Sequence, residues 1–138
     1  MKKLFGLLLT IILFTSCTKQ DNFIAPTEDN NSQLFFKDAN LAVRSILATA
    51  STNASIKIDF STLYEKNITK IELMSGETPN YLCAIYTVNI TINSSQLKNY
   101  STIEDNPKSQ TMYYMIRYTL ANGDWGYTNI LKFQRNKM

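Results

Sequence analysis

The sequence predicts an all-β fold, an antiparallel β-sandwich of about seven strands. From Leu34 onward, short runs rich in β-branched and aromatic residues alternate with turn residues at the intervals of a sandwich. Within residues 55–60 and 69–74, apolar and charged residues alternate, which is the period of a strand with one buried face. No segment keeps a helical apolar period over the length of a helix, although residues 42–50 fit either an opening strand or one or two helical turns.

The clearest pattern is a β-hairpin over residues 112–133, in which two apolar and aromatic runs flank Asn122-Gly123. This dipeptide favours a two-residue type I′ turn, because both central residues of that turn need positive φ. Such a turn pairs Met112 with Phe133, Tyr114 with Leu131, Ile116 with Asn129, Tyr118 with Tyr127, and Leu120 with Trp125. This register places these large side chains on a buried face, and the opposite face receives Arg117, Thr119, Thr128 and Lys132.

The alternation also separates buried from exposed side chains. We expect seven side chains to be nearly fully buried: Ile58, Phe60, Ile71, Leu73, Tyr114, Ile116 and Leu131. Five charged side chains should be exposed to water: Lys57, Lys70, Glu72, Arg117 and Lys132.

The order of these motifs resembles fibronectin type III-like domains, immunoglobulin-like β-sandwiches found in secreted proteins of Gram-negative bacteria. The resemblance rests on Phe60-Ser61-Thr62, Glu65-Lys66-Asn67, Glu104-Asp105-Asn106-Pro107, Tyr113-Tyr114-Met115-Ile116-Arg117 and Asn122-Gly123-Asp124-Trp125-Gly126-Tyr127-Thr128-Asn129. It covers residues 41–133, with Phe60 at the place of the family's buried Trp. The resemblance implies a structural or binding module and brings no catalytic residues with it.

The first 16 residues have the pattern of a secretory signal peptide. Lys2 and Lys3 precede an apolar run at residues 4–14, which is shorter than the roughly 20 residues of a membrane-spanning helix. Phe14-Thr15-Ser16-Cys17 resembles the lipobox of bacterial lipoproteins, whose cysteine is lipidated and becomes the mature N-terminus. We therefore predict a signal peptide at residues 1–16 and lipidation at Cys17, which gives the protein a membrane partner. Ordinary cleavage near Ser16, which leaves a free thiol, is the alternative.

Residues 17–33 are polar and predict a lipidated N-terminus and a disordered tether ahead of one folded domain at residues 34–138. By resemblance to the sorting rule of Gram-negative lipoproteins, Thr18 after the cysteine favours the outer membrane, in either leaflet. Without Lys2 and Lys3, 12 basic and 11 acidic residues remain, so the formal net charge falls from +3 to +1. No basic cluster of the kind that binds nucleic acid is left.

Few residues in the chain suggest catalysis. Histidine is absent, which removes the commonest general base and metal ligand, so we expect no enzyme, no cofactor and no metal. Glu104 and Asp105 are adjacent and should point to opposite faces of a strand unless they lie in a turn, and we expect hydrogen bonds to loops from Glu65. Cys83 lies in an apolar run, where a small buried side chain is the simpler interpretation than a nucleophile, and with Cys17 lipidated we expect no disulfide within the domain.

The aromatic residues are the remaining candidates for binding. Trp125 and Tyr127 near the hairpin tip, with Tyr64 and Tyr81 on predicted loops, would form a sugar-stacking platform if their rings were exposed. The hairpin register instead places Trp125 and Tyr127 on the buried face or at its rim. The sequence therefore favours a non-catalytic envelope lipoprotein, a module that binds or assembles with another envelope protein, and the alternative is carbohydrate binding through the hairpin-tip aromatics.

Overall fold

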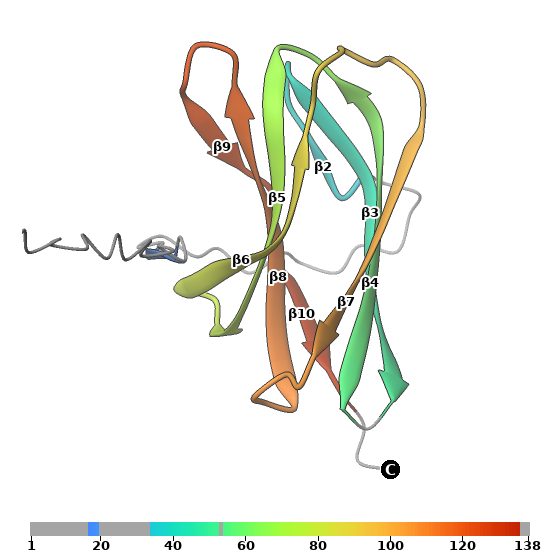
Figure 1. Ribbon diagram of the computed structural model, residues 1–138, viewed down its shortest axis with the longest axis vertical. Coiled ribbons are helices and arrows are strands. Elements are labelled where there is room, and N and C mark those ends of the chain that lie inside the picture. The colour runs from blue at the N-terminus through green and yellow to red at the C-terminus, as the bar shows by residue number, and fades with distance from the viewer. Residues whose placement is uncertain (1–16, 20–33, 53, 136–138) are drawn as a thin grey trace, which may run out of the picture.

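The computed structural model describes residues 17–19, 34–52 and 54–135, which form two antiparallel sheets packed face to face (Figure 1). The all-β sandwich predicted from the sequence is confirmed. The predicted signal peptide at residues 1–16 lies outside the described residues, as does the predicted tether from residue 20 to residue 33.

One sheet contains, in spatial order, β1 (Cys17–Lys19), β6 (Tyr81–Asn89), β5 (Ile68–Thr78), β8 (Thr111–Leu120) and β10 (Leu131–Gln134), with β9 (Trp125–Tyr127) also beside β8. The other sheet contains β2 (Phe36–Lys37), β3 (Leu41–Thr52), β4 (Ser55–Glu65) and β7 (Lys98–Asp105). The residues 42–50 that fitted a strand or a short helix belong to β3. The charged residues inside β4 and β5 do not interrupt these strands, because successive side chains of a strand point to opposite faces.

The core lies between the two sheets, and six of the seven predicted core side chains are at most 2% exposed: Ile58, Phe60, Ile71, Leu73, Tyr114 and Ile116. Leu131 is half-buried, because β10 pairs only with β8 and lies at the edge of its sheet. Phe60 packs in the middle of this core, with its ring stacked on Tyr100 at a centroid distance of 4.7 Å.

Part of the predicted exposure of charged side chains was wrong, and the difference lies on the outer face of the larger sheet. Lys57 and Lys132 are exposed as predicted and Lys70 is half-buried, but the prediction was wrong for Glu72 and Arg117, which are only 5% and 8% exposed. They lie opposite each other on the central strands β5 and β8, and Arg117 Nε donates to Glu72 Oε2 at 2.8 Å.

A second apolar cluster continues along this outer face. It consists of Met74, Leu82, Met115 and Ile130, with Ala84, Tyr113 and Tyr127 packed against it. Both faces of β5 are therefore covered, and a charged residue on the outer face can lie flat across its neighbours instead of projecting into water.

The buried pair should make stability depend on pH in the acid range. Burial raises the pKa of the Glu72 carboxyl, but hydrogen bonds from Arg117 and Lys70 outweigh burial and hold the pKa below its ordinary value of 4.5. Because the folded-state pKa is lowered, this stabilisation is fully present above the unfolded-state pKa and is lost as the pH falls through the folded-state pKa. Glu72→Gln should therefore lower the free energy of unfolding by about 1–3 kcal/mol at pH 7 and by much less at pH 3.

Urea denaturation of both proteins at the two pH values measures this difference. Asp59 carries a second lowered carboxyl pKa, mainly through its hydrogen bond with Lys57, and it is unchanged in both proteins, so the comparison isolates Glu72. An equal loss at pH 7 and pH 3 would show that the carboxylate charge does not contribute.

The hairpin keeps its predicted register at the open end and loses it at the tip. Tyr114 pairs with Leu131 and Met112 with Phe133, as predicted. Nearer the tip, however, Trp125 pairs with Thr119 and Tyr127 with Arg117, so the predicted pairing there was wrong by one residue.

The loop causes this shift because it has three residues, 121–123, rather than two. Leu120 N donates to Asp124 O at 2.7 Å, Gly123 N donates to Leu120 O at 3.0 Å, and Gly123 has a φ of 91°. This is a turn followed by a left-handed residue, the usual three-residue hairpin connection.

A β-bulge restores the predicted register farther along the hairpin. Thr128 N donates to Ile116 O at 2.9 Å, whereas Leu131 already pairs with Tyr114, so Asn129 and Ile130 together oppose Met115. The bulge places Ile130 in the outer apolar cluster and lets Asn129 Nδ2 donate to Phe35 O at 2.7 Å.

Candidate functional site

The structure does not gather the four predicted aromatic residues into one platform. Trp125 is 66% exposed, which corrects the expected burial and follows from the one-residue shift in the hairpin. Tyr127 is half-buried against the outer apolar cluster, so it is at the rim. Tyr64 and Tyr81 belong to β4 and β6 and lie in different parts of the sandwich.

The hydroxyl of Tyr64 bonds to the turn that precedes β3. This hydroxyl donates to Asp38 O, and the hydroxyl of Tyr118 donates to Asp38 Oδ2. Asp38 Oδ1 accepts hydrogen bonds from Asn40 N and Leu41 N, each at 2.7 Å, and so fixes the turn that leads into β3. Burial, followed by the Asp38 carboxylate, raises the pKa of Tyr118, so this phenol remains a donor. Tyr64 therefore holds a turn, and its half-buried ring has Lys66 Nζ 5.0 Å from its centroid.

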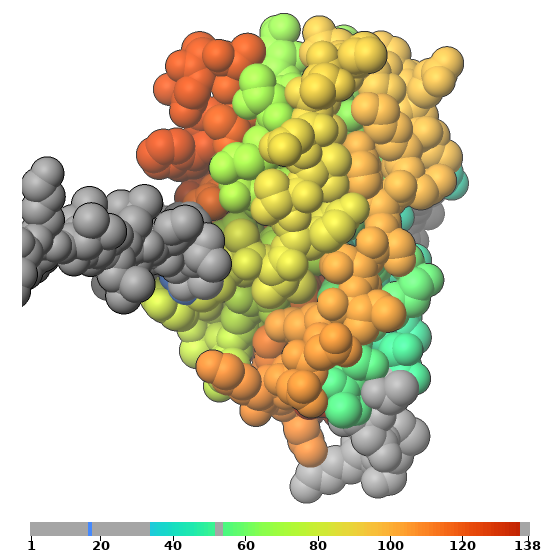
Figure 2. Space-filling model, in the orientation of Figure 1, coloured from blue at the N-terminus to red at the C-terminus, as the bar shows by residue number. Residues whose placement is uncertain are grey.

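Tyr81 borders a groove with a volume of about 470 Å³ at the edge of the sandwich. The groove is lined by the end of β5, the first half of β6, the end of β7 with the loop that follows it, and Met112 of β8. These segments meet on the face shown in Figure 2, where β6 is yellow and β7 is orange. Tyr81 and Ile85 are 59% and 37% exposed, so part of the groove wall is apolar and open to solvent.

Glu104 is the best-fixed polar group of the groove. Ser75 Oγ donates to Glu104 Oε1 at 2.8 Å, and Tyr114 Oη donates to Glu104 Oε2 at 2.7 Å. Burial raises the pKa of Tyr114, and the Glu104 carboxylate raises it further, so the phenol stays protonated and keeps donating. These bonds tie the groove to the core through Tyr114.

Glu104 and Asp105 both line the groove, although adjacent residues of a strand point to opposite faces. The strand β7 ends at Asp105, and the chain turns at Asn106, which has a φ of 52°. Glu104 is half-buried and Asp105 is exposed, so one carboxylate is fixed while the other remains on the rim.

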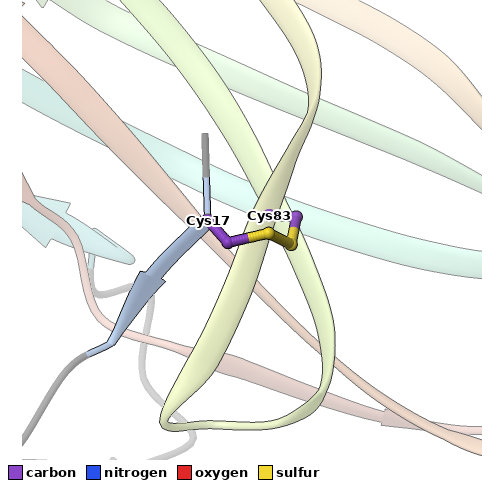
Figure 3. The surroundings of a disulfide bond; sticks show 2 residues. All are labelled: Cys17 and Cys83. Carbon is purple, nitrogen blue, oxygen red and sulfur yellow. A yellow bond between two sulfur atoms is a disulfide. The ribbon is translucent and has the colours of Figure 1, made fainter. Parts of the chain in front are cut away.

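The groove wall also contains a disulfide, which corrects the expectation that the domain has none. Cys17 is bonded to Cys83, and β1 lies antiparallel beside β6 with Cys17 opposite Cys83 and Lys19 opposite Tyr81 (Figure 3). Cys83 is therefore neither a buried apolar residue nor a free nucleophile. The first residues of the predicted tether, Cys17–Lys19, are a short strand.

Glu65 lies at the opposite end of the sandwich, and its carboxylate bonds to side chains of the strands β4 and β7 rather than to the loops that the sequence predicted. Its carboxylate is fully buried and accepts hydrogen bonds from Thr62 Oγ1 at 2.7 Å, Tyr100 Oη at 2.5 Å and Lys98 Nζ at 2.6 Å. Burial, then Glu65, raises the pKa of Tyr100. These three donors occupy both carboxylate oxygens, so Glu65 fixes β7 to β4.

Residues 17–19, 34–52 and 54–135 contain no group of three or more His, Cys, Asp or Glu side chains placed to hold a metal ion. In the same part of the chain, no helix has the length and hydropathy to cross a membrane.

Comparison of the chain with known protein families, curated proteins and solved structures found no match. The candidate site is therefore defined by its geometry alone. Sequence reasoning had singled out Tyr81 but missed its groove neighbours Ile85, Ser75 and Pro107, which come from three separate segments. The signal that could have found them is the turn cluster at residues 75–80, which places the end of β5 beside the start of β6.

Proposed function

We propose that the protein is a non-catalytic binding module of the Gram-negative cell envelope, attached to the outer membrane through lipid at Cys17, which recognises a protein partner at the groove between β6 and β7. The observation that carries the proposal is the groove itself, where exposed apolar side chains, the fixed carboxylate of Glu104 and the exposed one of Asp105 lie beside the edge of a sheet. Such an edge offers unpaired backbone groups to a partner, and the groove offers side-chain selectivity.

The edge strand supports this proposal. On the side away from β5, β6 pairs with β1 only at Tyr81, Leu82 and Cys83, and residues 84–89 have no partner strand there among the described residues. An exposed strand edge next to apolar side chains is a template for strand addition.

Two observations support a location in the cell envelope. The lipobox-like leader directs the chain to export, and disulfides persist in oxidising compartments such as the periplasm and the cell surface. The Cys17–Cys83 bond and the leader therefore agree on a compartment outside the cytoplasm.

A photo-crosslinking amino acid at Ile85 tests the groove. In intact cells this residue should crosslink to one discrete envelope polypeptide, because its side chain borders the groove and is partly exposed. The matched control is Leu47, an exposed aliphatic residue of the other sheet at 61% exposure, which should give no product. Equal crosslinking at both positions would contradict recognition at the groove.

The exposure of Trp125 favours carbohydrate binding as a second candidate function. The indole lies opposite Thr119, which in turn lies opposite Lys70, so hydrogen-bonding groups are close to the exposed ring. An exposed aromatic face beside polar groups is suited to stacking against a sugar ring, although the four predicted aromatic residues, all within the described part of the chain, do not form one platform.

Trp125 is the chain's only tryptophan, so its fluorescence reports on this candidate directly. Carbohydrate binding predicts that envelope polysaccharides shift the emission to shorter wavelength, and that Trp125→Ala abolishes retardation in polysaccharide-containing gels. Asn122→Ala, an exposed change in the same hairpin, should leave the retardation unchanged. Unaltered emission at saturating polysaccharide would remove this candidate.

A further inference from the structure

The disulfide and the proposed lipid anchor both use the sulfur of Cys17, so the two cannot be present on one chain at the same time. In the structure this sulfur is bonded to Cys83 (Figure 3). A sulfur that forms a thioether to a lipid has no valence left for Cys83. The disulfide form and the lipidated form are therefore two different states of the same protein.

We propose that β1 is a removable strand, which covers the start of β6 in the disulfide form and leaves it in the lipidated form. The β6 edge that it leaves then takes an extended, basic segment of another polypeptide, which adds as an antiparallel strand beside the groove. This inference rests on the proposed function and names the mode of binding at that same groove.

The short length of β1 makes it removable. It has three residues, and its pairing with β6 is limited to Cys17, Thr18 and Lys19. Ordering each residue costs about 1–2 kcal/mol of backbone entropy, whereas a hydrogen bond contributes about 1 kcal/mol net. Three paired residues do not hold a chain end in place without the covalent bond.

The pairing of β1 with β6 also shows which strand direction and register the β6 edge accepts. The β1 strand runs antiparallel to β6, and Lys19 is opposite Tyr81 at the mouth of the groove. A replacing segment in this register makes the same backbone contacts and continues toward residues 84–89, which lack a partner strand on that side among the described residues.

The net negative charge of the groove lining favours a partner segment that is basic. Three carboxylates line the groove, from Glu77, Glu104 and Asp105, against one cation, Lys108. Opposite charges favour association and exclude acidic competitors. The exposed rings and aliphatic groups of Tyr81 and Ile85 accept the apolar residues that alternate with the basic ones.

The two states form by different chemistry. In the disulfide form, the thiols of Cys17 and Cys83 lose two protons and two electrons to an oxidised dithiol carrier of the envelope, whose own disulfide becomes two thiols. In the lipidated form, the Cys17 thiolate displaces a phosphate ester from the glyceryl carbon of a phospholipid. One C–S bond forms, one C–O bond breaks, the thiol proton goes to the released phosphate, and Cys83 keeps its thiol.

The test compares three forms of the mature chain, residues 17–138: the disulfide form, Cys83→Ser, and Cys83→Ser with Cys17 alkylated by iodoacetamide as a thioether. The probes are a hexapeptide of alternating lysine and valine and its counterpart with glutamate in place of lysine. Binding is followed by NMR shifts of the backbone amides of β6.

We expect the basic peptide to bind the two forms without a disulfide at least tenfold more tightly than the disulfide form, with shifts at Tyr81–Asn89, and the acidic peptide not to bind. Faster amide hydrogen exchange at residues 81–83 in those two forms should show that β1 has left. Equal binding by all three forms, unchanged exchange, or shifts confined to other strands would overturn the inference.

Failure of the inference and failure of the proposed function are distinguishable. Mass spectrometry of the membrane fraction tests the anchor, because Cys17 should carry acyl chains and Cys17→Ser should move the protein out of that fraction. If Cys17 is acylated and Ile85 still crosslinks while the peptide fails, the removable strand is wrong and the binding module stands. If Cys17 is not acylated, both the anchor and the removable strand are wrong.

Discussion

Replacing Phe60 with alanine should lower the free energy of unfolding by about 3–5 kcal/mol, a large share of the stability of a domain this size. Phe60 is 2% exposed, stacks on Tyr100 with an interplanar angle of 21°, and meets Tyr86 edge-on at 6.5 Å. Truncation removes these contacts and leaves a cavity between the two sheets, which the rigid sheets close only in part. Urea denaturation monitored by circular dichroism measures the loss.

Ile103→Ala is the matched control for Phe60→Ala. Ile103 is on the neighbouring strand β7 but is 57% exposed, so its truncation should change stability by less than about 0.5 kcal/mol. Similar losses for both variants would mean that the register of β4 and β7 differs from the structure.

The sequence predicted the sandwich well because its strands alternate strictly. The inward positions of β4 and β5, such as Ile58 and Ile71, follow from the period alone, and the structure buries both completely. The alternation assumes that one face of a strand is wet, however. It therefore could not predict that Glu72 and Arg117 on the outer face would bury each other, which depends on both strands being central in the sheet.

The hairpin shows where local pattern stops being sufficient. Asn122-Gly123 correctly marked the turn, but it fits a two-residue or a three-residue loop, and the choice shifts every side chain at the tip to the other face. Gly126 is the residue of the sequence that points to the three-residue loop. A Cβ atom there would lie 2.3 Å from the Tyr118 ring, so only glycine fits opposite Tyr118, the pairing that the structure contains.

The groove could not be predicted from the sequence, because its lining comes mainly from the end of β5, the start of β6 and the end of β7. Tyr81 was a candidate on chemical grounds, but its neighbours depend on which strands lie at the edges of the two sheets. The disulfide was missed for a different reason, because Cys17, the only other cysteine in the sequence, was assigned to the lipid anchor, which left Cys83 without a partner.

Glu65→Ala should lower the free energy of unfolding by about 2–4 kcal/mol, the second large effect. The change leaves the hydroxyls of the buried Thr62 and the half-buried Tyr100 without their acceptor, and each unsatisfied buried group costs about 1–3 kcal/mol. Lys98 also loses its carboxylate, but its side chain is 36% exposed and can turn to water, which keeps the total below that of a fully buried ion pair.

Two control variants distinguish the loss of the Glu65 hydrogen bonds from the simple removal of a negative charge. Glu65→Gln keeps one acceptor oxygen for Tyr100 or Thr62, so it should lose clearly less stability than Glu65→Ala when both are unfolded in urea. Glu77→Ala removes an exposed carboxylate at the other end of the sandwich and should change stability by less than about 0.5 kcal/mol. If Glu65→Ala were as mild as Glu77→Ala, the three hydrogen bonds would not be what fixes β7 to β4, because the buried Thr62 hydroxyl would then have lost its acceptor at no cost.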